Sequence, residues 1–571
     1  MAEQVTVIDQ IIQCIEHKES FVLNAGAGSG KTFTLVQTID YITNLKIQKQ
    51  QKILCVTFTN VAKDEIVARL KNFNYDKIII STLHDFVWWY IKQFQKELQK
   101  QVKGLADRKI VKLRDEIAEA QRKIDNPRRN TNIEKQSGII DINSKRIAKY
   151  CGVDYDTLDI KYDIYSAYYR GVISHDDVLE IMSEFLDDIF FAKMFLNSFP
   201  YILIDEYQDT NYPILSKILE RIQTIPTSIK SVVGLYGDSM QQIYSSNNFD
   251  LSGLSINEID KLDNYRTNQI IVSANNKLRG DGLEQNCTMQ NPLVPFGFLE
   301  FVFNMSTDIK LKNFQSVKDD FGFYKRLYLS NRNIADEIGF SSLSQIFNDK
   351  YNKHSNEKLL KLEDPFLNFI MNHLVVLLVE FEKGNYYNII QEIKSINEII
   401  LKRIYNEIEM LILDTETNLE KCLDIFIEYK LIDVKKYMEI LDTYDDEDTF
   451  IQELLTVKVE EFKNLKKQID NLTSLDTLHG VKGKEFEKVI INIFYNQPWN
   501  QYDFDKLIKK QDYEKVSVKN AHKLLYVACT RAKTHLVINY IIDPVHKVNS
   551  DHIKDAVANM YGTSMRFTIY E

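Results

Sequence analysis

The chain has 571 residues, and 71 basic against 81 acidic side chains give it a formal net charge of −10. Its apolar fraction of 44% is ordinary for a globular protein, and 19 glycines with 9 prolines exclude a collagen-like or flexible low-complexity chain. At about 150 residues per domain, this length predicts three to four domains. The acidic total argues against a histone-like coat on nucleic acid, although a local basic channel depends only on nearby charges.

The cysteines and the N-terminal segment limit the class of protein further. Six cysteines lie far apart and none forms a C-x-x-C pair, so we expect neither a zinc ribbon nor a disulfide framework. Residues 1–20 carry acidic and polar side chains, which differs from the basic and then apolar pattern of a secretory signal. No run of 18 apolar residues stands out. We therefore expect a cytoplasmic protein that does not act at a membrane.

Short apolar runs alternate with helical patterns in the first half of the chain. Each run is rich in Val, Ile and Leu and is continuous, which is typical of a parallel strand buried on both faces. Their alternation with helices predicts a doubly wound α/β sheet. The predicted strands are residues 21–24, 52–58, 76–84, 200–206 and 231–238.

A second α/β region follows residue 262. Its strand candidates are residues 326–330, 488–495 and 533–542. Each α/β region is interrupted by helical sequence, the first by a Lys-, Glu- and Gln-rich stretch and the second by strongly amphipathic helices. The predicted domains are therefore residues 1–90 with 195–262, a helical insertion at 91–194, a second α/β domain at 263–345 with 468–571, and a second helical insertion at 346–467.

The segment AGAGSGKT ends a predicted strand and opens a helical pattern, which is the context of a P-loop. Its glycines let backbone N–H groups turn toward a β-phosphate at the helix N-terminus. Lys31 can reach the β- and γ-phosphates, and the Thr32 hydroxyl can bind Mg²⁺. A glycine-rich turn without phosphate is the alternative, which the GKT triplet disfavours. The predicted phosphate-binding residues are Ala25, Gly26, Ala27, Gly28, Ser29, Gly30, Lys31 and Thr32.

A later strand candidate, YILID, ends in the acid pair Asp205 and Glu206. A buried strand would bring Asp205 to the sheet edge at which Thr32 holds Mg²⁺. Glu206 is then a candidate general base for the attacking water. Acid pairs at strand ends are often solvated turns, and the P-loop upstream is what favours the catalytic interpretation.

The acid pair begins DEYQDTN (205–211), which resembles the second motif of the UvrD/Rep/PcrA helicases of superfamily 1. Further motifs of that family follow in order over nearly the whole chain. The resemblance implies two RecA-like P-loop motor domains, each with a helical insertion, and an ATP-dependent DNA helicase. The similar segments are VTFTNVAKDEI (56–66), STLHDF (81–86), GDSMQQIY (237–244), LDNYRT (262–267), TLHGVKGKEF (477–486) and LLYVACTRAK (524–533), with Gln10 upstream of the P-loop.

The resemblance also assigns roles around ATP and Mg²⁺. Cations would surround the γ-phosphate, where negative charge spreads during phosphoryl transfer. The implied catalytic residues are Glu206, Lys31, Arg266 and Arg531, with Gln241 sensing the γ-phosphate or orienting water. The implied metal ligands are Thr32 and Asp205, and the implied nucleotide contacts are Gln10 and Tyr265 to adenine and Glu485 to the ribose.

The implied DNA contacts are independent of base sequence. Stacking on aromatic rings contributes about 1–3 kcal/mol per base and tolerates any base. Core packing is the alternative for each aromatic residue, most clearly for Phe86, and we expect Trp88 and Trp89 in the core. The implied stacking residues are Phe58, Tyr244 and Phe86, and the implied polar contacts are Thr57, Asn60, His84, Thr477 and His479.

The chain departs from the family pattern in several places. Tyr244 runs into Ser245 where the family has an aromatic–Arg–Gly segment, so one stacking ring is missing, and Lys484 replaces an apolar residue. The second insertion is short, and no fused nuclease domain is expected after the last motif. Compact UvrD-like proteins of this kind occur as helicase subunits beside an OLD-type nuclease in Gabija antiphage systems. The resemblance thus makes such a nuclease a candidate partner in a hetero-oligomer.

Three functions remain open from the sequence. The first is an ATP-driven 3′→5′ translocase or helicase on single-stranded or partly duplex DNA, with the polarity implied by the resemblance alone. The second is an ATP- or DNA-sensing regulatory subunit that activates a partner nuclease with little unwinding of its own. The third, a housekeeping repair helicase, is disfavoured by the departures from the family pattern.

Overall fold

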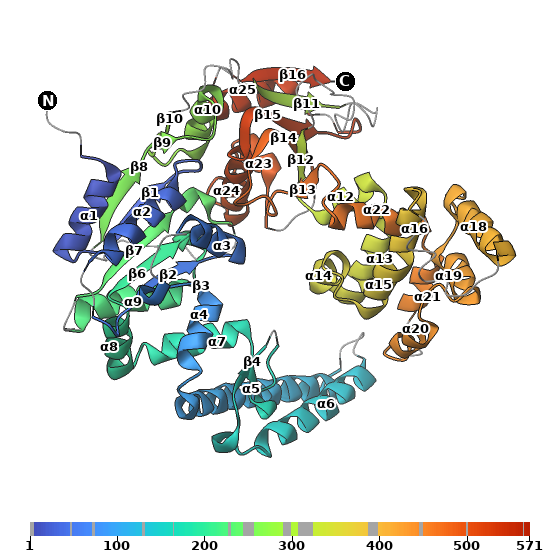
Figure 1. The fold of residues 1–571 in the computed structure, drawn as a ribbon, viewed down its shortest axis with the longest axis horizontal. Coiled ribbons are helices and arrows are strands. Elements are labelled where there is room, and N and C mark those ends of the chain that lie inside the picture. The colour runs from blue at the N-terminus through green and yellow to red at the C-terminus, as the bar shows by residue number, and fades with distance from the viewer. Residues whose placement is uncertain are drawn as a thin grey trace. The chain divides into compact units, whose positions relative to one another are not determined.

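The structure is a computed structural model, and it divides the chain into two compact units. Unit 1 comprises Met1–Arg266 and Asp281–Met289, and unit 2 comprises Thr267–Gly280 and Gln290–Glu571. Each unit contains one six-stranded sheet (Figure 1). The residues that the structure describes are 5–45, 48–70, 75–127, 132–163, 165–226, 230–243, 256–288, 298–305, 324–385, 398–444, 449–497, 501–546, 548–562 and 565–570.

The sheet of unit 1 is parallel throughout, in the order β3-β2-β6-β7-β1-β8. Its strands are β1 (Phe21–Ala25), β2 (Ile53–Thr57), β3 (Ile78–Thr82), β6 (Tyr201–Asp205), β7 (Val232–Gly237) and β8 (Asn257–Lys261). A separate short parallel pair is formed by β9 (Asp263–Asn264) and β10 (Asn286–Cys287).

Helices cover both faces of this sheet. Neighbouring residues of a strand point to opposite faces, so Phe21 and Leu23 pack in one core with α1 and α2, whereas Val22 packs in a second core with α4, α8 and α9. Burial on both faces explains why the strands are continuously apolar. The helices are α1 (Val7–His17), α2 (Lys31–Thr43), α3 (Asn60–Arg69), α4 (Leu83–Ile91) and α9 (Tyr212–Thr224).

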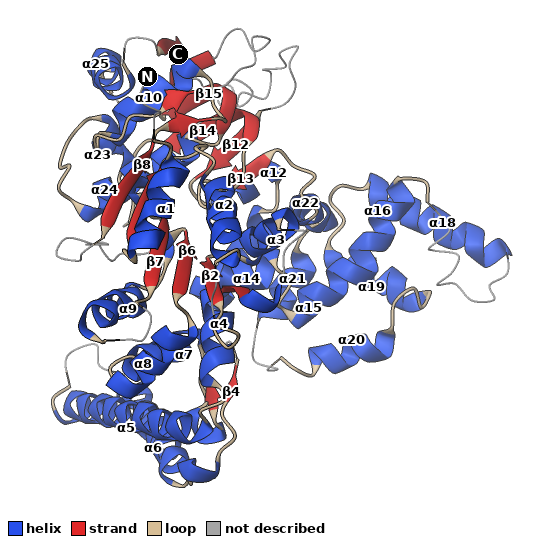
Figure 2. Cartoon of the chain, turned by 60° about the vertical axis from the view of Figure 1, so that its left-hand side comes forward, coloured by secondary structure: helices blue, strands red, loops and turns tan. Residues whose placement is uncertain are grey.

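A helical region separates α4 from β6 in the chain. Its long helices α5 and α6 lie side by side (Figures 1 and 2), and α5, α7 and α8 add apolar side chains to the second core of unit 1. The elements are α5 (Gln95–Asp125), α6 (Ile133–Cys151), β4 (Lys161–Tyr162), β5 (Val172–Ile173), α7 (His175–Phe185) and α8 (Ile189–Ser198).

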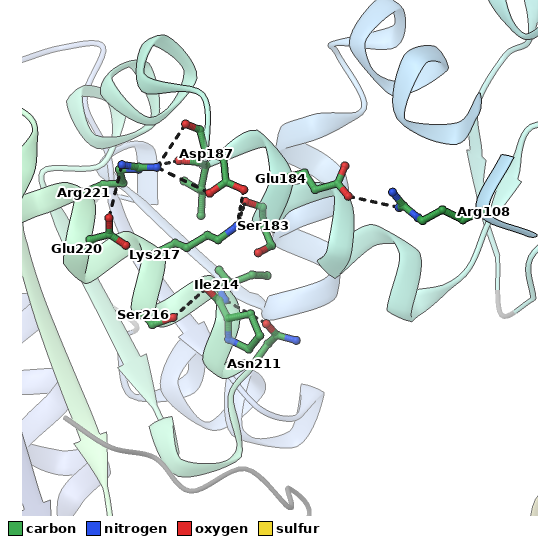
Figure 3. Close-up of polar contacts among 12 residues, drawn as sticks. Arg108, Ser183, Glu184, Asp187, Asn211, Ile214, Ser216, Lys217, Glu220 and Arg221 are labelled. Atoms are coloured by element: carbon green, nitrogen blue, oxygen red, sulfur yellow. Dashed lines mark hydrogen bonds and ion pairs between the residues drawn. The ribbon is translucent and has the colours of Figure 1, made fainter. Parts of the chain in front are cut away.

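Polar contacts also join this helical region to α9, the helix that begins directly after the DEYQDTN segment (Figure 3). Lys217 Nζ of α9 lies 2.6 Å from Asp187 Oδ2, and the Arg221 Nε donates to the Leu186 carbonyl at 2.9 Å. Arg108 of α5 in turn pairs with Glu180 of α7 at 2.7 Å. These pairs are partly exposed and contribute little individually, so the shared apolar core provides most of the attachment.

The sheet of unit 2 is also parallel throughout, in the order β13-β12-β14-β15-β11-β16. Its strands are β11 (Phe298–Asn304), β12 (Lys325–Tyr328), β13 (Leu475–Thr477), β14 (Phe486–Phe494), β15 (Ala532–Ile541) and β16 (Arg566–Tyr570). The helices outside its helical region are α10 (Gln269–Arg279), α23 (Phe504–Ile508), α24 (Val516–Cys529) and α25 (Ser550–Tyr561).

Between β12 and β13 the chain forms a helical region with its own apolar core. Its segment Ser355–Glu382 is, within the described residues, the single helical stretch long and apolar enough to cross a membrane by composition, with a mean hydropathy of 1.4. Half of the 18-residue window that has this mean hydropathy is buried inside the structure, as expected for a core helix. The helices are α12 (Asn331–Ile338), α13 (Ser341–Tyr351), α14 (Ser355–Leu360), α15 (Pro365–Phe369), α16 (Val376–Glu382), α18 (Glu398–Leu413), α19 (Leu419–Glu428), α20 (Val434–Leu441), α21 (Phe450–Thr456) and α22 (Val459–Ile469).

The α/β class with two parallel-sheet motor domains is confirmed. All six cysteines are free thiols. Within the two six-stranded sheets, four strands were not among the predicted runs, namely β8, β11, β13 and β16. The boundary between the units also falls later than residue 262, because residues 263–266 and 281–289 belong to unit 1.

Candidate functional site

The AGAGSGKT segment forms a tight turn between β1 and α2. Gly28 and Gly30 adopt φ angles of +78° and +79°, a conformation that glycine reaches without strain. Gly30 is the N-cap of α2, and no side chain caps the first turn of this helix. Uncapped N–H groups at a helix N-terminus attract anions, so the loop suits a phosphate.

Residues that follow β8 in the chain donate hydrogen bonds to carbonyl groups of this phosphate loop. The Asn264 and Gln285 side-chain amides donate to the Ala27 carbonyl at 3.0 and 3.2 Å, and the Tyr265 N–H donates to the Gly28 carbonyl at 2.9 Å. A Cβ on Gly26 would lie 2.6 Å from the Gln285 amide carbon. Gln285 therefore shapes the loop, although no motif in the sequence pointed to it.

Lys31 and the acid pair meet at the carboxyl end of β6. Lys31 Nζ lies 2.6 Å from Glu206 Oε1. Burial alone would lower the pKa of Lys31, but Glu206 and Asp205 outweigh it and the pKa is raised. Asp205 is 3% exposed, and burial raises its pKa to about 6 against the attraction of Lys31. The three residues predicted from separate motifs, Lys31, Asp205 and Glu206, thus lie in one cluster.

Two buried oxygens at this cluster have no hydrogen-bond partner among the described residues, namely Ser29 Oγ and Asp205 Oδ1. A carboxylate with an unused lone pair fits a hard cation, and a buried hydroxyl fits a phosphate oxygen. In the described part of the chain, no group of three or more His, Cys, Asp or Glu side chains is arranged so that it could hold a metal ion. Mg²⁺ in nucleotide sites needs only one or two protein ligands, so Thr32 and Asp205 fit the role proposed for them.

Gln241 lies beside the acid pair in the turn after β7. Its Nε2 donates to Asp238 Oδ2 at 2.9 Å, and the backbone N–H of Asp238 donates to Gln208 Oε1 at 3.2 Å. Gln208 Nε2 in turn donates to Glu206 Oε2 at 2.6 Å. The sequence prediction included Gln241 and Glu206 but missed Gln208, which lies in the same motif as Glu206.

The other nucleotide-side residues of unit 1 lie on several elements. Gln10 is half-buried on α1, and Arg266 is half-buried at the last position of unit 1 before the chain enters unit 2. The Tyr265 ring is 56% exposed, with Lys261 Nζ 5.8 Å from its centre. An exposed ring next to the phosphate loop is free to stack on a planar ligand.

Arg531 and Glu485 belong to unit 2. Arg531 is 2% exposed, and its guanidinium donates to the Val527 and Lys484 carbonyls at 2.9 and 3.2 Å. Glu485 is exposed and pairs with Lys533 at 2.9 Å. In this structure Arg531 therefore braces the segment before β14.

The predicted DNA contacts of unit 1 divide into exposed and buried side chains. Phe58 is 39% exposed and Asn60 is exposed at the first turn of α3. Thr57 is buried, and its hydroxyl donates to the Thr59 carbonyl at 3.1 Å. Tyr244 lies outside the described residues.

Phe86 corrects one expectation, because its ring is only 2% exposed. It packs against Tyr90, Phe195 and Phe199, with ring centres 5.3 to 6.3 Å away. Since a core ring has no free face for a base, Phe86 is a packing residue here. Trp89, by contrast, is partly exposed, which differs from the core position expected for it.

The two predicted histidines both lie in polar and aromatic surroundings. The His84 ring contacts His175 of α7, with centres 5.2 Å apart, and burial lowers the pKa of His84. In unit 2, His479 is bonded to the Tyr502 hydroxyl at 2.8 Å, and burial lowers its pKa as well. The Thr477 hydroxyl accepts from the Gly480 N–H at 2.9 Å. Neutral imidazoles suit hydrogen bonding to bases better than phosphate neutralisation.

Comparison with known proteins agrees with this geometry. Residues 8–255 match the UvrD/REP helicase N-terminal domain. The chain is 26% identical to the Gabija protein GajB of Bacillus cereus (strain HuB5-5), over 98% of each protein. It is 24% identical to a probable DNA helicase II homolog of Mycoplasma genitalium, over 93% of this chain and 84% of that protein, and 26% identical to the ATP-dependent DNA helicase PcrA of Bacillus subtilis, over 45% and 37%. The N-terminal part of the chain therefore resembles the UvrD/REP helicases, and the similarity to a DNA helicase II homolog extends over 93% of the chain.

Proposed function

We propose that this helicase moves 3′→5′ along single-stranded DNA and acts with a partner nuclease in antiphage defence. The observation that carries the motor part is the contact of Lys31 with Glu206 at an uncapped phosphate loop. Beside it, Asp205 Oδ1 has no hydrogen-bond partner among the described residues. These are the three side chains that phosphoryl transfer needs at one place: a cation for the phosphates, a base for water and a carboxylate for Mg²⁺.

The Lys31–Glu206 ion pair is then the resting state of the site. Phosphate oxygens of ATP replace Glu206 as the partner of Lys31, which releases the carboxylate to accept a proton from the attacking water. Thr32 and Asp205 would hold Mg²⁺, which supplies positive charge to the phosphates when bound. Gln241 and Arg266 are the nearby side chains assigned to the γ-phosphate.

Strand binding in this proposal uses the exposed residues that follow β2. The Phe58 ring is 39% exposed and is the one proposed to stack on bases, and Asn60 lies at the exposed N-terminus of α3. Stacking and helix N-termini recognise bases and phosphates without regard to sequence. The 3′→5′ direction rests on the family resemblance.

The defence role rests on the similarity to the Gabija protein GajB, which extends over 98% of both proteins. We propose an OLD-type nuclease as partner, in a cytoplasmic hetero-oligomer. The specific observation that favours the alternative, a sensing subunit that activates the nuclease with little unwinding, is the absence of the aromatic–Arg–Gly segment after Tyr244.

The motor proposal is tested by ATP hydrolysis with and without single-stranded DNA. We expect DNA to stimulate ATP hydrolysis by the wild type, Lys31→Ala to abolish the stimulated rate, and Glu206→Gln to lower it to a small residual rate. Lys100→Ala, at an exposed lysine of α5, is the matched control and should leave the rate unchanged. Equal hydrolysis with and without DNA would contradict the translocase.

Direction and partner need two further measurements. Strand displacement from duplexes with a 3′ or a 5′ tail should succeed only with the 3′ tail. A nuclease encoded beside this chain should co-purify with it, and its activity should depend on Lys31 if the alternative function is correct. Absence of a stable partner would remove the defence assembly and leave a free helicase.

A further inference from the structure

Gln208 is a polar side chain in an unusual place. It lies in the 3-10 turn Tyr207–Asp209 that follows β6, and its exposed fraction is 0%. A buried amide without partners destabilises a protein by about 1–3 kcal/mol. Its hydrogen bonds therefore account for its burial, and they lead to two different parts of the nucleotide site.

One end of the Gln208 amide faces the catalytic carboxylate. Nε2 donates to Glu206 Oε2 at 2.6 Å, while the other carboxylate oxygen, Oε1, lies 2.6 Å from Lys31 Nζ. The Glu206 carboxylate is thus held on both oxygens by two different side chains. When phosphate replaces it at Lys31, the bond to Gln208 remains.

The other end of the amide faces the turn after β7. Gln208 Oε1 accepts the backbone N–H of Asp238 at 3.2 Å. Asp238 uses its carboxylate oxygens to accept Met240 N–H at 3.1 Å and Gln241 Nε2 at 2.9 Å. An unbroken chain of contacts therefore runs from Lys31 through Glu206, Gln208 and Asp238 to Gln241.

Packing fixes the orientation of this amide. A Cβ on Gly237 would lie 2.2 Å from Gln208 Oε1 and 2.5 Å from the Tyr207 ring. The Gln208 amide therefore packs directly against the backbone of Gly237. A reversed amide would set its NH₂ against the Asp238 N–H and its oxygen against the Glu206 carboxylate. Both contacts would be repulsive, so a single orientation is stable.

We propose that Gln208 is a positioning residue of the ATPase reaction. Gln208 holds the Glu206 carboxylate in position after Lys31 has exchanged this carboxylate for the phosphates. It also connects the position of the carboxylate to the turn that contains Gln241. A γ-phosphate contact at Gln241 is therefore transmitted to the general base through Asp238 and Gln208. This inference rests on the proposed motor function and names a further residue for it.

The test compares two buried glutamines with the same substitution in the full chain. Gln208→Met keeps the length of the side chain and removes its hydrogen bonds to Glu206 and to the Asp238 N–H, together with a long one to Asp209 Oδ2 at 3.5 Å. The matched control is Gln99→Met, because Gln99 is also buried, lies in the helical region of unit 1 and donates to the Leu158 carbonyl at 2.8 Å. DNA-stimulated kcat, KM for ATP, affinity for a fluorescent ADP analogue and melting temperature are measured for each.

We expect Gln208→Met to lower kcat about ten- to hundredfold while affinity for the ADP analogue changes less than about threefold. Gln99→Met should leave both unchanged. Gln208→Glu keeps the acceptor for the Asp238 N–H and replaces the donor to Glu206 by a like charge, so it should lose at least as much kcat. Equal kcat of the Gln208→Met and Gln99→Met proteins would overturn the proposal.

A double-mutant cycle separates positioning from a structural role. If Gln208 acts through Glu206, adding Gln208→Met to Glu206→Gln should lower the residual rate less than about twofold. If the effects multiply, Gln208 acts independently of the base and the proposal is wrong. The same assay distinguishes this outcome from failure of the motor function, because then the wild type itself would not hydrolyse ATP in response to DNA.

Discussion

Replacing Asp205 by asparagine measures what it costs to bury a carboxylate at the nucleotide site. Burial raises the pKa of Asp205 from 3.8 to about 6, in spite of the nearby charge of Lys31. The Asp205 carboxyl group therefore binds its proton more tightly in the folded protein than in the unfolded chain. The stability that results is complete below pH 3.8 and is lost as the pH rises through about 6.

The size of this loss follows from the shift. About two pKa units correspond to about 3 kcal/mol well above pH 6 and to about half of that at pH 5. Asp205→Asn removes the titration, and any cost of its unpaired amide is the same at both pH values. Relative to the wild type, the variant should gain stability between pH 5 and pH 8, by about 1 kcal/mol or about 2 °C in Tm.

Scanning calorimetry in EDTA without nucleotide, at pH 5 and pH 8, is the direct measurement. Asp40→Asn, at an exposed acid on α2, is the matched control and should show no gain between the two pH values. Mg²⁺ with ADP should raise the Tm of the wild type more than that of Asp205→Asn, and the variant should hydrolyse no ATP. A Tm difference that is the same at both pH values would refute the argument from burial.

Four further substitutions test the site and its neighbours. Gly26→Ala would place a Cβ 2.6 Å from the Gln285 amide, so we expect a fluorescent ADP analogue to bind at least tenfold more weakly. Unchanged binding would show that the phosphate loop or Gln285 moves to accommodate the Cβ. Phe58→Ala should weaken single-stranded DNA binding by about 1–3 kcal/mol at constant Tm, measured by anisotropy. Phe86→Ala should instead lower the free energy of unfolding by about 3–5 kcal/mol, and the reverse pattern would contradict the assignment of these two rings. Arg531→Lys removes buried hydrogen bonds to two carbonyls, so both the Tm and the ATPase rate should fall. Loss of activity at unchanged Tm would mean that these hydrogen bonds contribute little to stability.

Strands buried on both faces were the predictable part of the fold. β6 and β7 consist entirely of buried residues, and a continuous apolar run predicts such a strand directly. β8 has a different pattern, because it lies at the sheet edge and only Ile259 and Lys261 are buried along it. In β11 the buried Glu300, which pairs with Arg566 and accepts from Thr568, interrupts the apolar pattern.

The candidate site was predictable where its residues are adjacent in sequence. Lys31, Asp205 and Glu206 follow directly from two short motifs at strand ends. Gln285 was not predictable, because its importance comes from the Ala27 carbonyl, which lies 258 residues away in the chain. The burial of Phe86 depends in the same way on Phe195 and Phe199, which sequence order does not place beside it.

The segment LDNYRT shows how one short motif can serve both units. Its first five residues belong to unit 1, where Asn264 and Tyr265 donate to carbonyls of the phosphate loop. Its end belongs to unit 2, where the Thr267 hydroxyl donates to the Ala532 carbonyl at 3.2 Å, directly after Arg531. Arg266 is the residue between these two anchors. The residue that contacts the phosphate loop, Tyr265, and the residue that contacts the carbonyl next to Arg531, Thr267, are therefore only two positions apart in the chain.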